Sequence, residues 1–206
     1  MTEEESWGLL TKEQFDDLVI KFTKRFGKPI QSRRLSFSFW DHNRNNVDTR
    51  IKITDGNAEI MQKMGSWEMN CKWSRSEQKV NLPSNAGEIF NAYQIIRVLI
   101  TGEDSCYIAQ FDNYIFKQPN FEIKLTHQLG KTDKYNFEVE ADIEKVDLSQ
   151  VLKDLELSEM VTLTNSEFWD KWNKELNLKD NSMDEKQILD LIVKYLTPVP
   201  VNLDRC

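Results

Sequence analysis

Residues 50–63 read RIKITDGNAEIMQK, and this stretch decides the fold. Arg50 and Lys52 alternate with isoleucines, which is the two-residue repeat of a strand with one charged face and one apolar face. The Asp55-Gly56 pair that follows is a hairpin turn signal, and alternation resumes after it. The stretch therefore predicts a β-hairpin with one charged side.

The same alternation recurs along the chain. Leu35, Phe37 and Phe39 alternate with serines in the segment before the hairpin. Together with residues 34–40, strands are predicted at residues 50–53, 59–63, 69–80, 107–116, 121–126 and 137–143. The pattern indicates about seven or more antiparallel strands.

Helical spacing appears at the start of the chain, in its middle and at its end. Thr11 and Gln14 form a capping-box signal before an amphipathic segment that ends near Gly27 and Pro29. Further helices are predicted at residues 87–99, 148–157, 166–176 and 184–196. The fold class expected from these patterns is α+β.

Composition excludes several classes of protein. The chain has 206 residues, and its 39% hydrophobic content is enough for a core. Its net charge of −7 argues against non-specific electrostatic binding of DNA. Cys71, Cys106 and Cys206 form no CxxC pair, so neither a disulfide framework nor a zinc site is indicated. No apolar run approaches the roughly 20 residues of a membrane helix, and we expect a cytoplasmic protein.

Charged residues share single strand faces. The sets that alternation groups together are Arg50 with Lys52, Glu59 with Lys63, Arg75 with Glu77, Glu122 with Lys124, and Glu138 with Glu140 and Asp142. One interpretation is that these faces are simply solvated, as antiparallel sheets often are on one side. The other is that they point inward and line a polar tunnel for a polyphosphate, with carboxylates holding Mg²⁺ or Mn²⁺.

The tryptophans also leave two interpretations open. Aromatic faces can stack on nucleobases, which is one function for Trp40, Trp67 and Trp73. Core packing is the ordinary alternative, since aromatic side chains bury large areas. Trp169 and Trp172, three residues apart on a predicted helix, are interpreted as a packing stripe.

In their order along the chain, these features resemble the CYTH superfamily of triphosphate tunnel enzymes. The resemblance covers roughly residues 33–178, and it rests on the ordered set of motifs more than on any one of them. The matching motifs are Arg50-Ile-Lys52, Asp55-Gly56, Lys63, Arg75-Ser-Glu77, the predicted helix at 87–99, Ile123-Lys-Leu125, Leu129-Gly130 and Phe137-Glu-Val-Glu140.

The resemblance implies a closed antiparallel β tunnel barrel with flanking helices. It would comprise residues 31–178, with residues 1–30 as an N-terminal helical segment packed on it and residues 179–206 as a C-terminal helical appendage. The residues that it implies for phosphate binding are Arg50, Lys52, Lys63, Arg75 and Lys124. Glu138 and Glu140 would hold Mg²⁺ or Mn²⁺ and serve catalysis.

One family motif is missing where it is expected. The opening strand of the family, Glu-x-Glu-x-Lys, should lie near residues 33–41, which read RRLSFSFWD. Two hypotheses follow. The first is a metal-dependent hydrolase of triphosphates, acting on the 5′-triphosphate end of RNA or on inorganic tripolyphosphate. The second is a catalytically degenerate tunnel domain that binds a phosphorylated ligand, or a protein partner through the C-terminal helix.

Overall fold

A single nine-stranded antiparallel sheet forms the centre of the computed structural model, which describes residues 3–40, 47–65, 75–101, 106–142 and 144–197. The strands are β1 Glu3–Leu10, β2 Ile30–Trp40, β3 Val47–Thr54, β4 Asn57–Gly65, β5 Arg75–Leu82, β6 Tyr107–Lys117, β7 Phe121–Leu129, β8 Lys134–Asp142 and β9 Leu178–Lys179. Their order across the sheet is β1-β8-β7-β6-β2-β3-β4-β5, and the short β9 pairs with β6.

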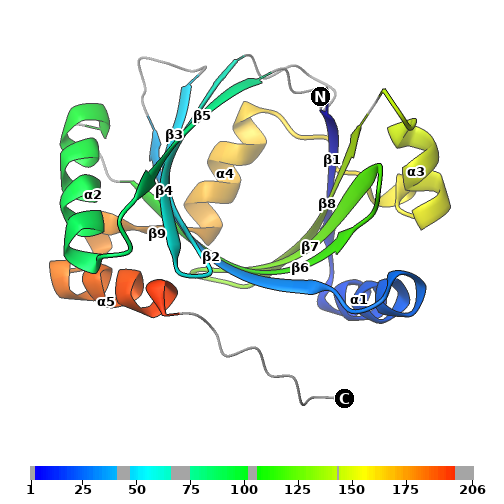
Figure 1. The fold of residues 1–206 in the computed structure, drawn as a ribbon, viewed down its shortest axis with the longest axis horizontal. Coiled ribbons are helices and arrows are strands. Elements are labelled where there is room, and N and C mark those ends of the chain that lie inside the picture. The colour runs from blue at the N-terminus through cyan, green and yellow to red at the C-terminus, as the bar shows by residue number, and fades with distance from the viewer. Residues whose placement is uncertain (1–2, 41–46, 66–74, 102–105, 143, 198–206) are drawn as a thin grey trace.

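The sheet curls into a trough (Figure 1). Strands β1, β8 and β7 form one wall, β6 and β2 the floor, and β3, β4 and β5 the other wall. The two end strands, β1 and β5, do not pair with each other among the described residues. The closed barrel expected from the family resemblance is therefore not confirmed. The presence of both helices and an antiparallel sheet confirms the α+β class.

Five α-helices accompany the sheet. They are α1 Lys12–Phe26, α2 Ala86–Thr101, α3 Leu148–Leu155, α4 Ser166–Leu176 and α5 Glu185–Leu196. Helices α1 and α3 lie outside one wall, α2 and α5 lie outside the other, and α4 lies inside the trough (Figure 1). None of the described helices combines the length and apolar composition that crossing a membrane requires.

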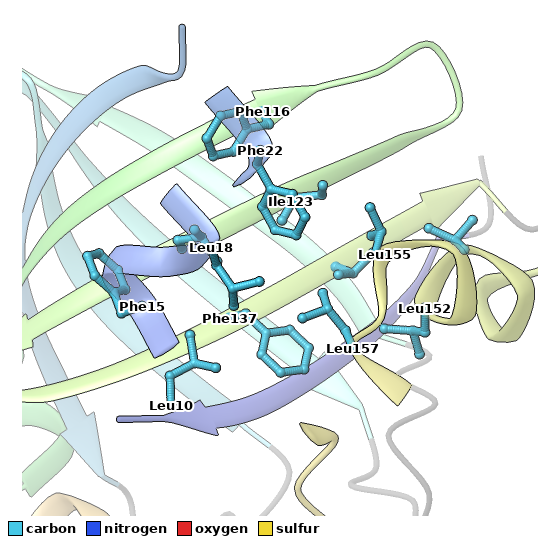
Figure 2. Close-up of a cluster of buried hydrophobic side chains, with 13 residues drawn as sticks. Leu10, Phe15, Leu18, Phe22, Phe116, Ile123, Phe137, Leu152, Leu155 and Leu157 are labelled. Atoms are coloured by element: carbon cyan, nitrogen blue, oxygen red, sulfur yellow. The ribbon is translucent and has the colours of Figure 1, made fainter. Parts of the chain in front are cut away.

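The apolar face of the sheet points outward and is covered by helices. In the cluster of Figure 2, Phe15 and Phe22 of α1 and Leu155 of α3 pack against Ile123 and Phe137 of the sheet. A second cluster joins α2 and α5 to β2 and β3 in the same way. Burial of these side chains, at roughly 25 cal/mol per Å² of apolar surface, is what holds the helices in place.

The first helix follows its sequence signals. The Thr11 hydroxyl accepts a hydrogen bond from the Gln14 backbone N–H (3.2 Å), and the Gln14 side chain accepts one from the Thr11 N–H (2.8 Å). Gly27, at φ 88°, ends the helix in a conformation that disfavours other residues. Both predicted ends of α1 are thus confirmed.

Two segments differ from their expected form. Within residues 1–30, expected to be helical, β1 forms an edge strand that pairs with β8 along its whole length. Residues 179–206 were expected to be an appendage, but Ile188 and Ile192 of α5 are buried in the second core cluster. The segment before α5 is also fixed, because buried Asp180 accepts hydrogen bonds from Tyr93 (2.6 Å) and Arg97 (2.5 Å).

Helix α4 is held in the trough at both of its ends. Before the helix, the Thr162 N–H donates to the Trp7 carbonyl on the outer edge of β1 (3.0 Å). At its last residue, the Leu176 carbonyl accepts from the Lys131 N–H in the β7–β8 turn (2.8 Å). Gly130 makes this approach possible, since a Cβ there would lie 2.1 Å from the Leu176 carbonyl oxygen.

Gly130→Ala should therefore lower the free energy of unfolding by about 1–3 kcal/mol, the usual cost of overpacking. Chemical denaturation is the measurement. Gly87→Ala is the control, because Gly87 lies in the first turn of α2 with its nearest neighbour 3.4 Å from an added Cβ, and alanine favours a helix. Equal effects of the two substitutions would contradict the tight approach of α4 to this turn.

Candidate functional site

A cavity of about 880 Å³ occupies the trough. Directly opposite residues of paired strands share a face, so the charged side chains that alternate along each strand meet on the inside. The cations that line the cavity are Arg34, Arg50, Lys52, Lys63, Lys79 and Lys124. The carboxylates that line it are Glu5, Asp48, Glu77, Glu122, Glu138 and Glu140.

The two walls have opposite character. The wall of β3, β4 and β5 carries four of the cations, and the wall of β1, β7 and β8 carries four of the carboxylates. The two walls face each other closely enough for their charges to interact. Burial alone would lower the pKa of Arg50, but the neighbouring carboxylate of Asp48 raises it. Glu5 and Glu138, on the opposite wall, raise it further. A ligand between the walls would touch both kinds of charge.

Most cations of the basic wall have carboxylate partners. Arg50 donates two hydrogen bonds to Asp48, at 2.9 Å and 2.7 Å. Lys63 and Lys79 share Glu77, at 3.3 Å and 2.6 Å. Each of these three cations is thus paired with a carboxylate and also lines the cavity.

Lys52 is the exception on this wall. Its side chain is buried and forms an ion pair with none of the described carboxylates. Burial, together with the nearby charges of Arg34, Arg50 and Lys63, lowers the pKa of Lys52 from 10.5 to about 7. An anionic ligand beside Lys52 would therefore stabilise the charged form of its amino group.

Arg34 extends the basic region onto the floor of the trough. It lies on β2, where its Nε donates to the Thr54 hydroxyl at 3.1 Å, and it has no ion pair among the described residues. Ser36, two residues on, lies directly opposite Lys52. The alternation of Arg34, Ser36 and Ser38 was the signal that could have identified this face from the sequence.

The opposite wall holds a cluster of three carboxylates. One ligand oxygen from each of Glu5, Glu138 and Glu140 lies within 4.8 Å of the others. Glu5 of β1 is directly opposite Glu140 of β8, and Lys124 of β7 is directly opposite Glu138. Lys124 donates a hydrogen bond to Glu138, and its Nζ is 3.9 Å from Glu140.

The charges in this cluster are distributed unequally. Burial would raise the pKa of Glu138, but Lys124 outweighs it and holds that pKa well below its usual range. Burial and a hydrogen bond to Glu138 raise the pKa of Glu140. Burial acts against the charge of Lys124 too, yet Glu138 and Glu140 raise its pKa. Glu138 thus carries its charge more readily than Glu140 does.

The donor set of this cluster fits a divalent cation. Carboxylate oxygens are the hard ligands that Mg²⁺ and Mn²⁺ prefer. The three side chains converge from two adjacent strands, and each can supply an oxygen at the same place. A divalent cation there would also lower the pKa of Glu140 and so favour its charged form.

The structure brings most of the predicted site residues together. Those that line the one cavity are Arg50, Lys52, Lys63, Lys124, Glu138 and Glu140. The side chain of Arg75 lies outside the described residues. Sequence analysis missed Glu5, Arg34 and Lys79 as parts of the site.

The position of the opening acidic strand is a correction. Sequence analysis sought it near residues 33–41, but that segment is β2 and lies on the floor of the trough. The acidic strand beside β8 is β1, where Glu5 joins the carboxylate cluster and Trp7 stands two residues later. The misplacement arose because the charge-rich start of β1 lacks the apolar alternation of a typical strand.

Helix α4 supplies the remaining part of the lining. Trp169 and Trp172 pack around Trp7 with ring centroids 5.1 Å and 5.6 Å away. Gln128 of β7 donates to Asn177 (2.6 Å), which in turn donates to Asn173 (2.8 Å). The expected packing stripe of tryptophans is present, and it faces the cavity.

Comparison with solved structures agrees with this architecture. A Bacillus halodurans protein described as a candidate adenylate cyclase aligns with 81% of this chain and 97% of its own, at 16% identity and a TM-score of 0.56. A candidate adenylyl cyclase from Hippeastrum, with a dominant triphosphatase activity, aligns over 76% and 89% of the two chains, at 14% identity and a TM-score of 0.53. The chain shares the fold of these two proteins, as the family resemblance predicted.

The same fold also occurs in a larger assembly among these matches. A chain of the Schizosaccharomyces pombe Mediator head module aligns over 79% of this chain and 98% of its own, at 12% identity and a TM-score of 0.54. No family model matches the sequence, and no curated protein matches it significantly. At these identities the matches establish the fold alone.

The lowered pKa of Lys52 has a consequence for stability. Between pH 7 and pH 10.5 the folded protein binds fewer protons at Lys52 than the unfolded chain, so the free energy of unfolding should rise with pH in this window. Below about pH 7 the cost of the buried charge is fully present. Lys52→Met removes this cost and should stabilise the protein by roughly 1–4 kcal/mol at pH 6.

The measurement is chemical denaturation of both proteins at pH 6 and pH 9.5. The advantage of Lys52→Met should shrink at the higher pH. Lys134→Met is the control, because Lys134 is exposed at the start of β8. If the stability difference between Lys52→Met and the unmodified protein did not change with pH, the pKa of Lys52 would not be lowered in the folded protein.

Proposed function

We propose that the protein is a metal-dependent hydrolase of triphosphates, acting on the 5′-triphosphate end of RNA or on inorganic tripolyphosphate. One observation carries this proposal. Lys52 and Arg34, which form no ion pair among the described residues, line the same cavity as the cluster of Glu5, Glu138 and Glu140. A chain of phosphates is the ligand whose charge and length suit the first group while presenting oxygens to a metal at the second.

The cations would bind and orient the phosphate chain. Four cations line the same part of the cavity. The charges of three of them, Arg34, Arg50 and Lys63, lower the pKa of the fourth, Lys52. An anion beside Lys52 would restore its proton and its full charge. Preorganised cations of this kind stabilise the charge that develops on phosphate oxygens during in-line attack.

The carboxylates would hold the metal. Glu5, Glu138 and Glu140 would bind Mg²⁺ or Mn²⁺, which when bound would neutralise phosphate charge and lower the pKa of a water. Glu138 is already ionised through Lys124, and Glu140 would lose its proton on binding. Lys124 would then remain beside the carboxylates as a further contact for phosphate.

The similarity to a triphosphatase supports this reaction class. The Hippeastrum protein with the same fold is named for a dominant triphosphatase activity. The substrate of the present protein is inferred from the cavity and not from that name.

Glu138→Gln and Glu5→Gln should each reduce metal-dependent phosphate release by roughly 100-fold or more, because each removes a charged oxygen ligand at little change in shape. Phosphate release from tripolyphosphate and from 5′-triphosphate RNA is the measurement, with Mg²⁺, Mn²⁺ or chelator. Glu122→Gln is the matched control: Glu122 lines the cavity but pairs with Lys117 (3.6 Å) and lies outside the cluster. Unchanged release in Glu138→Gln would refute the assignment.

A second candidate function is a binding module without catalysis. Lys124 already pairs with Glu138, and Trp7 stands where the family's opening strand carries its lysine. The similarity to a chain of the Mediator head module shows that this fold is also found within an assembly. A protein partner at the C-terminal helix would have to use its outer face, since Ile188, Ile192 and Tyr195 are buried.

Both candidates predict that tripolyphosphate binds in EDTA with uptake of a proton near pH 8, because the anion raises the pKa of Lys52 from about 7. Calorimetry in two buffers of different ionisation enthalpy measures this uptake. Lys52→Met should abolish the uptake and weaken binding by about tenfold. Binding without phosphate release under any metal condition would favour the binding module. No saturable binding would exclude both the hydrolase and a module that binds a phosphorylated ligand.

A further inference from the structure

The amino group of Lys52 can be reached from the cavity. Lys52 lies on β3, in one wall of the trough (Figure 1), and its side chain lines the cavity although the residue is only 8% exposed. Its Nζ forms no ion pair with the described carboxylates, and it is not one of the fully enclosed side-chain atoms that lack a hydrogen-bond partner. A small molecule in the cavity can therefore contact this nitrogen.

Cations surround Lys52 on three neighbouring strands. Arg50 shares its face of β3 two residues earlier, Arg34 lies on β2, and Lys63 lies on β4. All of them line the same cavity. Burial has the largest effect on the pKa of Lys52, and the charges of these three residues lower that pKa further, to about 7.

The carboxylates on the same side of the sheet do not supply a counter-ion to Lys52. Glu59 is directly opposite Lys52 on β4, but the two form no ion pair and Glu59 does not line the cavity. Glu77 raises the pKa of Lys52, yet its carboxylate is already shared by Lys63 and Lys79. The region around Lys52 therefore has an excess of positive charge that a negative group would balance.

The uncharged form of Lys52 is a nucleophile. A lysine amine reacts only without its extra proton, and nearby cations and burial favour that form. With a pKa of about 7, roughly nine-tenths of Lys52 is uncharged at pH 8, against about three in a thousand for an ordinary lysine. The reactive fraction of Lys52 is thus about 300-fold larger.

We propose that the amino group of Lys52 is a site of reversible carbamylation by dissolved carbon dioxide. The nitrogen lone pair forms a bond to the carbon of CO₂, and the electron pair of one C=O π bond moves to that oxygen. The nitrogen then releases one proton to solvent, which leaves a carbamate with one negative charge. CO₂ is small and uncharged, so the positive surroundings of Lys52 do not exclude it.

The charge of the product distinguishes CO₂ from other electrophiles. An aldehyde would convert the amine into an imine, which is neutral or positive, and the excess of positive charge would remain. A carbamate instead places an anion among the cations. Arg34, which has no ion pair among the described residues, and Arg50 are the guanidinium groups available to it.

Carbamylation would also regulate the cavity, and this consequence rests on the triphosphate function proposed above. The carbamate would replace the cationic form of Lys52 by an anion at the position where we expect a phosphate to bind. Like charges repel, so a triphosphate would be excluded while the carbamate is present. CO₂ and a triphosphate should therefore compete for the same site.

Carbon-13 NMR of the protein in labelled bicarbonate at pH 8, with EDTA, tests the modification. We expect a carbamate resonance in the unmodified protein and in the control Lys134→Met, whose substituted residue is exposed at the start of β8. The resonance should be lost in Lys52→Met, which removes a buried charge. Any carbamate resonance that persists in Lys52→Met belongs to another amino group.

The unmodified protein provides a check that needs no substitution. At a fixed concentration of dissolved CO₂ the resonance should already be present at pH 8, because Lys52 is then mostly uncharged. A resonance that appears only near pH 10 would belong to ordinary lysines and would overturn the proposal.

Addition of tripolyphosphate separates the two proposals. Absence of a resonance that depends on Lys52 would overturn carbamylation and leave the triphosphate function standing. Loss of the resonance on addition of tripolyphosphate would support carbamylation and its competition with phosphate. Persistence of the resonance at high tripolyphosphate concentration would support carbamylation and overturn phosphate binding at Lys52.

Discussion

A sheet with one apolar face and one charged face, curled toward the charged face, determines the rest of the structure. An antiparallel sheet more commonly turns its polar face to open solvent. Here the apolar face is convex and is covered by helices, while the ions converge on a cavity. Bringing many charges together out of bulk water is unfavourable unless they are paired. Pairs such as Arg50 with Asp48 meet this requirement, and Lys52 does not.

The part of the site that sequence could predict is the part that local alternation encodes. Arg50 and Lys52 share a face because they are two residues apart on one strand, and the same holds for Glu138 and Glu140. The family resemblance added the order in which these strands occur. That the charged faces point inward was left open by the pattern, since solvated faces have the same period. The curl of the sheet decides it.

The parts that sequence did not predict depend on long-range pairing. Glu5 reaches the carboxylate cluster only because β1 pairs with β8, more than a hundred residues away. Its strand begins with three glutamates, so no apolar repeat indicates an extended conformation there. Trp169 shows a similar limit: an aromatic stripe indicates packing but not the side of the sheet on which the helix packs.

The connection of Thr162 to Trp7 has a consequence for solubility. A sheet that is not closed by hydrogen bonds exposes backbone groups on its end strands, where strands of other molecules can add. At β1, the Trp7 carbonyl and the Leu9 N–H are both bonded to Thr162 on the chain's path into the trough. At the other end, β5 places Glu77 and Lys79 on its inner face. The segment that leads into α4 thus also occupies backbone groups on the edge of β1 and hinders the addition of strands from other molecules there.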